Sequence, residues 1–180
     1  MIVTAMDWFS REKMTREWRW GVPLIIAIIV LDQVSKAWIL GSSAFNALGC
    51  LPDTTMCGKM ELSGVFDLTM TWNRGVSFGA FQAEGLARWG LFLMIGTIAV
   101  GFSLWLLRAE RWMTALALAM VVGGAVGNLI GRARFGAVVD FRDFSGLYFP
   151  WIFNVADASI SVGAAALLLD QLLAGRKRPG

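Results

Sequence analysis

The sequence predicts an all-α membrane protein with four transmembrane helices, both termini in the cytoplasm and a small periplasmic β-sheet. Apolar residues other than glycine make up 57% of the 180 residues, whereas soluble domains reach roughly 45–50% with glycine included. Charged residues are 16%, against about 25% in soluble chains, and the mean hydropathy is +0.61. A soluble chain of this length could not bury so much apolar surface, so the surrounding medium is expected to be lipid.

Four stretches are long enough to cross a bilayer, which requires about 20 apolar residues per helix. We expect the spans at about residues 20–40, 86–107, 112–130 and 149–173, all within a single domain of residues 1–180. The third span ends in a glycine-rich segment that contains Gly123, Gly124 and Gly127. Small residues of this kind allow a neighbouring helix to approach closely.

The orientation follows from the placement of lysine and arginine, which favour cytoplasmic flanks. Nine of the 16 basic residues flank the spans on the side that carries both termini, and seven lie on the other side. We therefore expect both termini in the cytoplasm. The first apolar run is longer than the 7–15 residues of a signal peptide and no A-x-A site follows it, so we expect it to remain attached.

The longest predicted periplasmic segment covers residues 42–85. Alternation of apolar and polar residues over 65–72 predicts a strand, and the Asn73-Arg74-Gly75 sequence predicts a turn. A small sheet is therefore expected against the outer membrane face. Cys50 and Cys57 also lie in this oxidising compartment, where a local disulfide is expected.

The sequence contains no histidine, which excludes Ser-His-Asp and Cys-His hydrolases, HExxH metalloproteases and His-ligated zinc. Acid–base chemistry is left to carboxylates, lysine, cysteine or the single tyrosine, Tyr148. No metal or cofactor is expected. The net charge is +3, and no basic block is long enough to indicate a nucleic-acid partner.

Ionisable residues within spans are costly and are candidates for function, and we expect them to gather at the outer ends of the helices. Asp32 and Lys36 are spaced i,i+4 and therefore share one helix face. They form either a structural ion pair or the wall of a polar pocket. Asn128 and Arg132 have the same spacing at the end of the third span, and Arg132 is either an interface anchor or part of a site.

Asp140 follows the third span and Asp157 lies within the first two turns of the fourth. Two carboxylates in a partly dry site share one proton, so that one acts as a base and the other as an acid. Such a pair hydrolyses an amide without metal, serine or histidine. The alternative is that Asp140 is a loop acid and Asp157 a structural partner of Arg132 or Lys36, and spacing leaves both open.

Five motifs occur in order along the chain. They are Asp32-Gln33-Val34-Ser35-Lys36, Asn73-Arg74-Gly75, Gly127-Asn128 followed by Arg132, Val138-Val139-Asp140-Phe141 and Phe153-Asn154-Val155-Ala156-Asp157. Together they resemble lipoprotein signal peptidase (signal peptidase II), a family of bacterial inner-membrane aspartyl proteases. The resemblance covers about residues 20–173.

The resemblance implies an enzyme that cleaves diacylglyceryl-modified prolipoproteins just before the lipidated cysteine, at the periplasmic face of the inner membrane. It implies Asp140 and Asp157 as the catalytic residues. It further implies membrane lipid and a globomycin-type inhibitor as partners, and a periplasmic β-cradle with a short extracellular helix. The matching residues that line, order or support the site are Asp32, Lys36, Asn73, Gly75, Asn128, Arg132, Asn154 and Ala156.

One position departs from the family pattern, because Gly131 stands where an aspartate is usual. Glycine supplies no charge, so Asn128 or Arg132 must be oriented by other groups, and any cost should appear as weaker activity or stability. Two alternatives follow for the function. One is an impaired homologue that still binds lipoprotein precursors. The other is a four-span carrier, which the nearly apolar inner halves of the spans disfavour.

Overall fold

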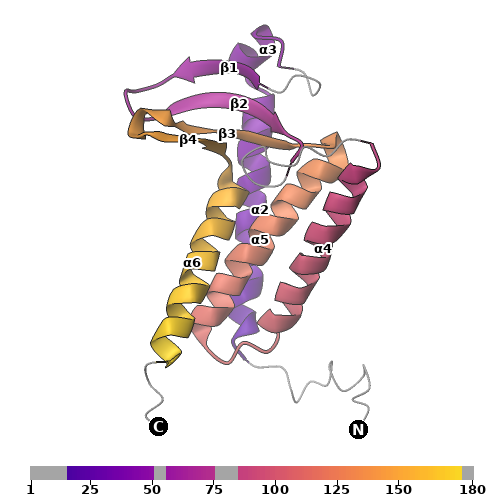
Figure 1. The fold of residues 1–180 in the computed structure, drawn as a ribbon, viewed down its shortest axis with the longest axis vertical. Coiled ribbons are helices and arrows are strands. Elements are labelled where there is room, and N and C mark those ends of the chain that lie inside the picture. Colours follow the sequence, from indigo (N-terminus) through magenta and orange to yellow (C-terminus); the bar gives the residue numbers. More distant parts are fainter. Residues whose placement is uncertain (1–15, 51–55, 76–84, 176–180) are drawn as a thin grey trace.

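The computed structural model describes residues 16–50, 56–75 and 85–175. The helices α2, α4, α5 and α6 form a bundle, and the sheet and the short helix α3 lie together at one end of it (Figure 1). The elements follow the order α2 (Trp18–Leu40), α3 (Ser43–Ala47), β1 (Met56–Glu61), β2 (Asp67–Asn73), α4 (Ala87–Leu106), α5 (Trp112–Phe135), β3 (Val138–Phe144), the 3-10 turn η3 (Ser145–Leu147), β4 (Phe149–Phe153) and α6 (Val155–Gly175).

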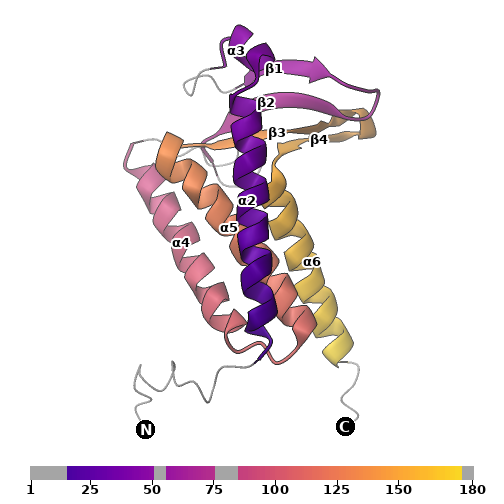
Figure 2. The ribbon, with the colours of Figure 1, turned by 180° about the vertical axis from the view of Figure 1, so that it is seen from behind.

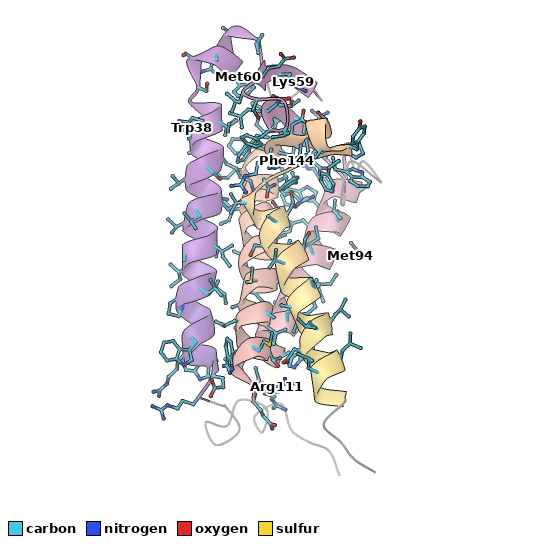
Figure 3. All side chains as sticks on the ribbon, turned by 90° about the vertical axis from the view of Figure 1, so that its left-hand side faces the viewer. Trp38, Lys59, Met60, Met94, Arg111 and Phe144 are labelled. Carbon is cyan, nitrogen blue, oxygen red and sulfur yellow. The ribbon has the colours of Figure 1, made fainter. Side chains whose placement is uncertain are left out.

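Four helices of the described chain are long and apolar enough to cross a membrane, which confirms the four predicted spans. Helix α5 is the central one, since 67% of its apolar window is buried against 17–22% for the other three. Seen from behind, α2 crosses in front of α5, with α4 and α6 on either side (Figure 2). Trp38 on α2 and Met94 on α4 point away from the bundle, as lipid-facing side chains do (Figure 3).

Both ends of the described chain lie at the end of the bundle opposite the sheet (Figure 1). This agrees with an even number of spans. The basic flanks at residues 11–13 and 176–178, which contribute to the expected orientation, lie outside the described residues.

The glycines of α5 allow the close helix packing that the sequence predicted. A Cβ at Gly124 would lie 2.4 Å from the carbonyl oxygen of Ala156 on α6, and one at Gly123 would lie 3.1 Å from Cβ of Ile28 on α2. A methyl group at Gly124 would clash with this backbone oxygen, and one at Gly123 would make a tight contact. The central helix therefore packs closely against α2 on one side and α6 on the other.

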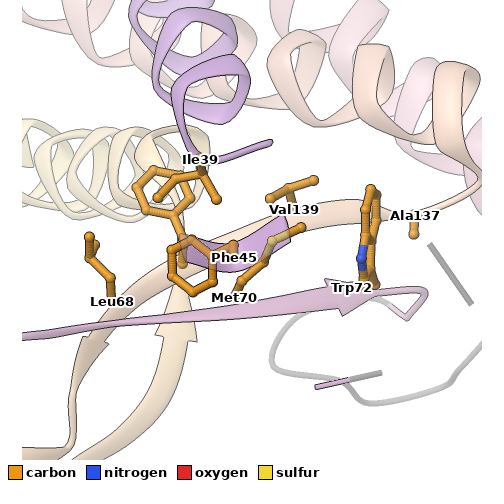
Figure 4. Close-up of a cluster of buried hydrophobic side chains, with 8 residues drawn as sticks. Ile39, Phe45, Leu68, Met70, Trp72, Ala137 and Val139 are labelled. Carbon is orange, nitrogen blue, oxygen red and sulfur yellow. The ribbon is translucent and has the colours of Figure 1, made fainter. Parts of the chain in front are cut away.

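The sheet is antiparallel, with the strand order β1-β2-β3-β4. Alternation places Met70 and Trp72 of β2 and Val139 of β3 on one face, where they form a buried cluster with Ile39 and Phe45 from α2 and α3 (Figure 4). The opposite face of β3 carries Asp140. The cluster thus fixes the sheet on the end of α2 and determines which way Asp140 points.

The predicted extent of the sheet and the predicted start of the fourth helix were wrong. The strand expected at 65–72 is β2, but β3 and β4 of the same sheet come from residues after the third span. The fourth helix begins at Val155 instead of Phe149, because the aromatic segment Phe149–Phe153 is strand β4. A continuous apolar run does not by itself separate a buried strand from a helix. The expected short helix outside the membrane is α3.

Ionisable residues in the spans do not all gather at the sheet end, contrary to expectation. Asp170 is fully buried near the far end of α6, where its carboxylate lies 2.5 Å from Nη2 of Arg111 and accepts a 2.5 Å hydrogen bond from Thr114. This group ties the end of α6 to the start of α5. Figure 3 places Arg111 at the end of the bundle opposite Lys59.

The disulfide expected between Cys50 and Cys57 is not formed. Both residues are free thiols packed against the cluster beneath the sheet. Burial, together with a hydrogen bond and the charge interaction with Cys57, raises the pKa of Cys50 to about 12.

Candidate active site

Asp140 is held on β3 with 2% of its surface exposed. Thr71 of β2 is its register partner, and this pairing of the two strands brings Asn73, two residues further along β2, close to Asp140. The side-chain amide of Asn73 donates to Oδ2 of Asp140 at 2.9 Å, and that of Asn154 donates to Oδ1 at 2.6 Å. Both carboxyl oxygens therefore have a defined amide donor.

Asp157 is held at the start of α6 by a reciprocal capping arrangement with Asn154. The backbone N–H of Asp157 donates to Oδ1 of Asn154 at 3.0 Å, and the backbone N–H of Asn154 donates to Oδ2 of Asp157 at 3.1 Å. This is a capping box with asparagine at the N-cap and aspartate three residues later. The same asparagine thus begins the helix and contacts both acidic residues.

Asn128 connects this pair to the rest of the bundle. Its Oδ1 accepts hydrogen bonds from Nζ of Lys36 at 3.0 Å and from Nδ2 of Asn154 at 3.2 Å. Its Nδ2 donates to Oδ1 of Asp157 at 2.8 Å. These partners assign the orientation of the Asn128 amide, since only one placement of oxygen and nitrogen satisfies all three.

Asp32 and Lys36 form a buried ion pair of 2.8 Å on α2, as their spacing predicted. The second oxygen of Asp32 accepts from the backbone N–H of Ala156 at 3.1 Å, which joins α2 to the start of α6. A Cβ at Gly127 would lie 2.7 Å from Oδ2 of Asp32, so glycine makes room for this carboxylate. The pair is therefore both structural and part of the site, through the bond of Lys36 to Asn128.

The two catalytic candidates have different electrostatic surroundings. Burial, and after it the charge of Asp157, raises the pKa of Asp140 from 3.8 to about 8, against the opposing effects of Asn73, Asn154 and Lys36. Asp140 therefore holds a proton at neutral pH. Asp157 lies in the first turn of α6, where the helix dipole favours a negative charge. The arrangement supplies one acid and one base.

Arg132 closes the site on the side of the β2 turn. Its Nη2 donates to the carbonyl oxygen of Gly75 at 2.6 Å, and the N–H of Gly75 donates to Oδ1 of Asn73 at 3.0 Å. These bonds confirm the predicted turn at residues 73–75. Gly131 is packed against the chain that follows α5. A Cβ added at Gly131 would lie 3.3 Å from the carbonyl oxygen of Ala137. Arg132 is thus oriented by Gly75 without an acidic neighbour at position 131.

All ten residues singled out in the sequence lie in one continuous hydrogen-bonded network. The residues are Asp32, Lys36, Asn73, Gly75, Asn128, Arg132, Asp140, Asn154, Ala156 and Asp157. Gln33 was not among them, yet its Nε2 donates to Asp32 at 2.9 Å and to the carbonyl oxygen of Gly127 at 3.1 Å. In the sequence, the position of Gln33 next to Asp32 within an apolar span was the feature that could have indicated its place in the network.

Comparison with known proteins identifies the family. The family model described as signal peptidase (SPase) II matches residues 24–173. The chain belongs to the signal peptidase II family. It is 44% identical over 159 residues to the lipoprotein signal peptidase of Caulobacter vibrioides, covering 86% of this chain and 88% of that one. It is 39% identical over 163 residues to the lipoprotein signal peptidase of Methylorubrum extorquens, covering 89% and 90%.

The fold is also similar to that of solved structures. A bacterial membrane enzyme determined by the in meso method at 2.3 Å resolution superposes with a TM-score of 0.73 at 21% identity, over 89% of this chain and 93% of that chain. A second, determined at 1.9 Å resolution, gives a TM-score of 0.68 at 22% identity, over 86% and 93%. Membership of the signal peptidase II family makes the protein a multi-pass membrane protease, and the ten-residue network lies within the matched region.

Proposed function

We propose that the protein is an aspartic endopeptidase in which Asp140 and Asp157 form the catalytic pair. Its substrates are prolipoproteins that carry a diacylglyceryl group on the lipobox cysteine, and it cleaves the peptide bond before that cysteine. The observation that carries the proposal is that both acidic side chains accept hydrogen bonds from Asn154, while burial and the charge of Asp157 raise the pKa of Asp140.

In the reaction, the Asp157 carboxylate takes a proton from a water molecule, whose oxygen attacks the scissile carbonyl carbon. Asp140 gives its proton to the carbonyl oxygen, so the intermediate is neutral. The C–N bond then breaks as a proton passes from Asp157 to the leaving amine and Asp140 regains one from the intermediate. The pair returns to its starting state with one shared proton.

The remaining network residues support this pair. Asn73 and Asn154 orient Asp140, and Asn128 orients Asp157. Asp32, Lys36 and Ala156 fix the start of α6 against α2. Arg132 and Gly75 hold the β2 turn beside the site, where a substrate backbone would lie, and a globomycin-type inhibitor would occupy the same space.

The site lies where the bundle meets the sheet, at the end opposite the described chain ends (Figure 1). The excess of basic residues on the terminal side supports cytoplasmic termini and a site at the periplasmic face of the inner membrane. Residues 1–180 would form a single domain, and a substrate could then enter it laterally from the membrane. Its acyl chains would remain in the bilayer while the scissile amide reaches the interface.

The alternative of an impaired, precursor-binding homologue is motivated by Gly131. The network argues against it, because Asn128 is oriented by Lys36, Asn154 and Asp157, and Arg132 by Gly75. The four-span carrier is disfavoured as well. The far-end charge Asp170 forms an ion pair with Arg111 and accepts a hydrogen bond from Thr114, and it marks no pathway along the bundle.

The test is turnover of a lipidated precursor by purified protein in detergent. Asp140→Asn and Asp157→Asn should each lower the cleavage rate by at least about 10²–10⁴-fold, the contribution of general acid–base catalysis. Asp143→Asn is the matched control, since Asp143 lies on the same strand but bonds to Thr69 and Lys59. Full activity in both single variants, with inhibitor binding retained, would refute the assignment.

A further inference from the structure

The free ends of the two β-hairpins carry a cluster of exposed apolar side chains. The first hairpin joins β1 to β2 through residues 62–66, and the second joins β3 to β4 through η3. We call the apolar residues exposed at and beside these two ends the apolar tip. Its members and their exposed fractions are Leu62 at 53%, Val65 at 48%, Leu147 at 58%, Tyr148 at 98% and Trp151 at 44%. Segments 62–66 and 145–151 contain no charged residue.

The two hairpin ends are packed together as one unit. A Cβ at Gly146 would clash with the carbonyl oxygen of Gly64, so the two turns approach each other through their backbones. Behind them the ring of Phe144 lies 4.9 Å from that of Phe66 and 5.7 Å from that of Phe153, measured between ring centroids. These rings fill the space between the hairpins. The apolar tip is therefore presented on a fixed support.

Tyr148 has an unusual backbone conformation within this tip. Its φ of 59° and ψ of 22° are left-handed, and among the residues that the structure describes it is the only non-glycine residue with a positive φ. This conformation is costly for a bulky side chain and persists where the surrounding structure imposes it. Because the side chain is almost fully exposed, few contacts within the protein offset that cost. The ring is held where a partner outside the chain can contact it.

The position of the tip relative to α6 indicates what that partner is. The apolar part of α6 runs over 19 residues from Val155 to Leu173, which is about 29 Å and close to the roughly 30 Å of a hydrocarbon core. Val155 therefore lies at the boundary of the hydrocarbon on the side of the sheet, and Trp151 is only four residues before it. The strands run across the end of the bundle and both hairpin ends extend beyond α6 (Figures 1 and 2). The tip thus lies over the lipid that surrounds α6, at the level of the headgroups.

The tip also continues a surface that already contacts lipid. On α6, Val162 is 55% and Leu168 is 68% exposed, as expected of side chains that face the acyl chains. Exposed apolar patches mark contacts with proteins or membranes, and tryptophan and tyrosine are enriched at the headgroup level because their rings are apolar and carry one polar group. The continuity with α6 and the lack of charge favour the membrane over a protein partner.

We propose that the apolar tip inserts into the headgroup layer of the bilayer beside α6, as a membrane contact additional to the four helices. Its side chains reach about 5–10 Å into the boundary between headgroups and acyl chains, as those of interfacial helices do. Strand β4 connects the tip directly to Asn154, and β3 connects it to Asp140. The contact therefore fixes the depth of the sheet in the interface. The inference rests on the exposed tip and the length of α6, and it does not depend on the proposed protease chemistry.

The experiment measures depth in phosphatidylcholine vesicles that contain the purified full-length protein. Tyr148→Cys carries an environment-sensitive fluorophore, in a background in which Cys50→Ala and Cys57→Ala remove the native thiols. Its emission should shift to shorter wavelength than that of Ala44→Cys, and a lipid with a nitroxide on its headgroup should quench it more strongly. Ala44 is the matched control because it is also exposed but lies on α3, at the far side of the sheet from the bundle (Figure 1). Leu168→Cys on α6 is the reference for the acyl-chain region.

A second measurement retains both native cysteines and decides the question if their replacement disturbs the fold, which thermal unfolding verifies. A benzophenone amino acid in place of Tyr148 should form a phospholipid adduct on irradiation, detected by mass, and the same group in place of Ala44 should not. Emission and quenching at position 148 equal to those at position 44 would overturn the proposal, as would the absence of a lipid adduct. A shift that disappears at low protein-to-lipid ratio would also overturn it, because a second copy of the chain would then cover the tip.

Discussion

The side-chain amide of Asn154 lies 2.6 Å from Oδ1 of Asp140. The same residue uses its backbone N–H and its Oδ1 to cap α6 against Asp157. One asparagine therefore sets the position of both acids, because it is at once the last residue before the helix and a donor to the strand. The geometry of the pair depends on a local capping motif as much as on the packing of the helices.

Substitution of Asn154 should separate capping from positioning. Asn154→Ser retains a side-chain cap but is too short to reach Asp140, whereas Asn154→Ala removes both functions. We expect both variants to lose about 10²-fold or more in kcat, the effect of a misplaced catalytic group. Only Asn154→Ala should also lose about 0.5–2 kcal/mol of stability. Cleavage assays and thermal unfolding measure the two effects, and activity that tracks stability across both variants would contradict the positioning role.

The pH dependence of cleavage should show an alkaline limb near the raised pKa of Asp140. Asp140 must hold a proton to act as the acid, so the rate should fall as the pH rises through about 8. The hydrogen bond from Asn73 favours the ionised carboxylate and opposes this shift. Asn73→Ala should therefore raise the pKa of Asp140 further and move the limb to higher pH. Asp143→Asn should leave the limb in place, and movement to lower pH in Asn73→Ala would count against the assignment.

The buried pair of Asp32 and Lys36 should behave as a coupled unit. Lys36→Met leaves Asp32, which is fully buried, without its counter-charge, and should destabilise the protein by about 3–5 kcal/mol. The double variant Asp32→Asn/Lys36→Met should be less destabilised than the sum of the two single variants. Unfolding by a denaturing detergent in mixed micelles measures the coupling, and strictly additive effects would show that the pair contributes no net interaction.

The contact between α5 and α6 should require a glycine at position 124. Gly124→Ala places a methyl group against the carbonyl of Ala156 and should cost about 1–3 kcal/mol, with reduced cleavage because α6 carries Asp157. Gly101→Ala on α4 is the matched control, since an added Cβ there meets nothing within 4 Å. That variant should gain about 0.5–1 kcal/mol from helix propensity. Thermal unfolding compares the two, and equal stability would argue against the close-packing role.

Part of the candidate site could be predicted from the sequence, because some of its residues are spaced as they are on one face of a helix. The i,i+4 separation of Asp32 and Lys36 predicted their shared face, and the glycines before Asn128 predicted a close neighbour. The strands β3 and β4 were not predicted, and β4 was missed because the apolar run at residues 149–153 continues directly into a helix. The capping role of Asn154 was hidden for the same reason, since the residue was placed inside the helix and not at its start.

Hydrophobic run length and helical periodicity are properties of neighbouring residues, and they alone determined the four membrane spans and the polar residues at their ends. The mutual bonds of those residues join positions far apart in the chain, such as Asp32 and Ala156, which are 124 residues apart. The tertiary structure also decided the environment that raises the pKa of Asp140. That environment arises from burial and from the charge of Asp157, which a separate element brings close, and no local pattern in the chain encodes that proximity.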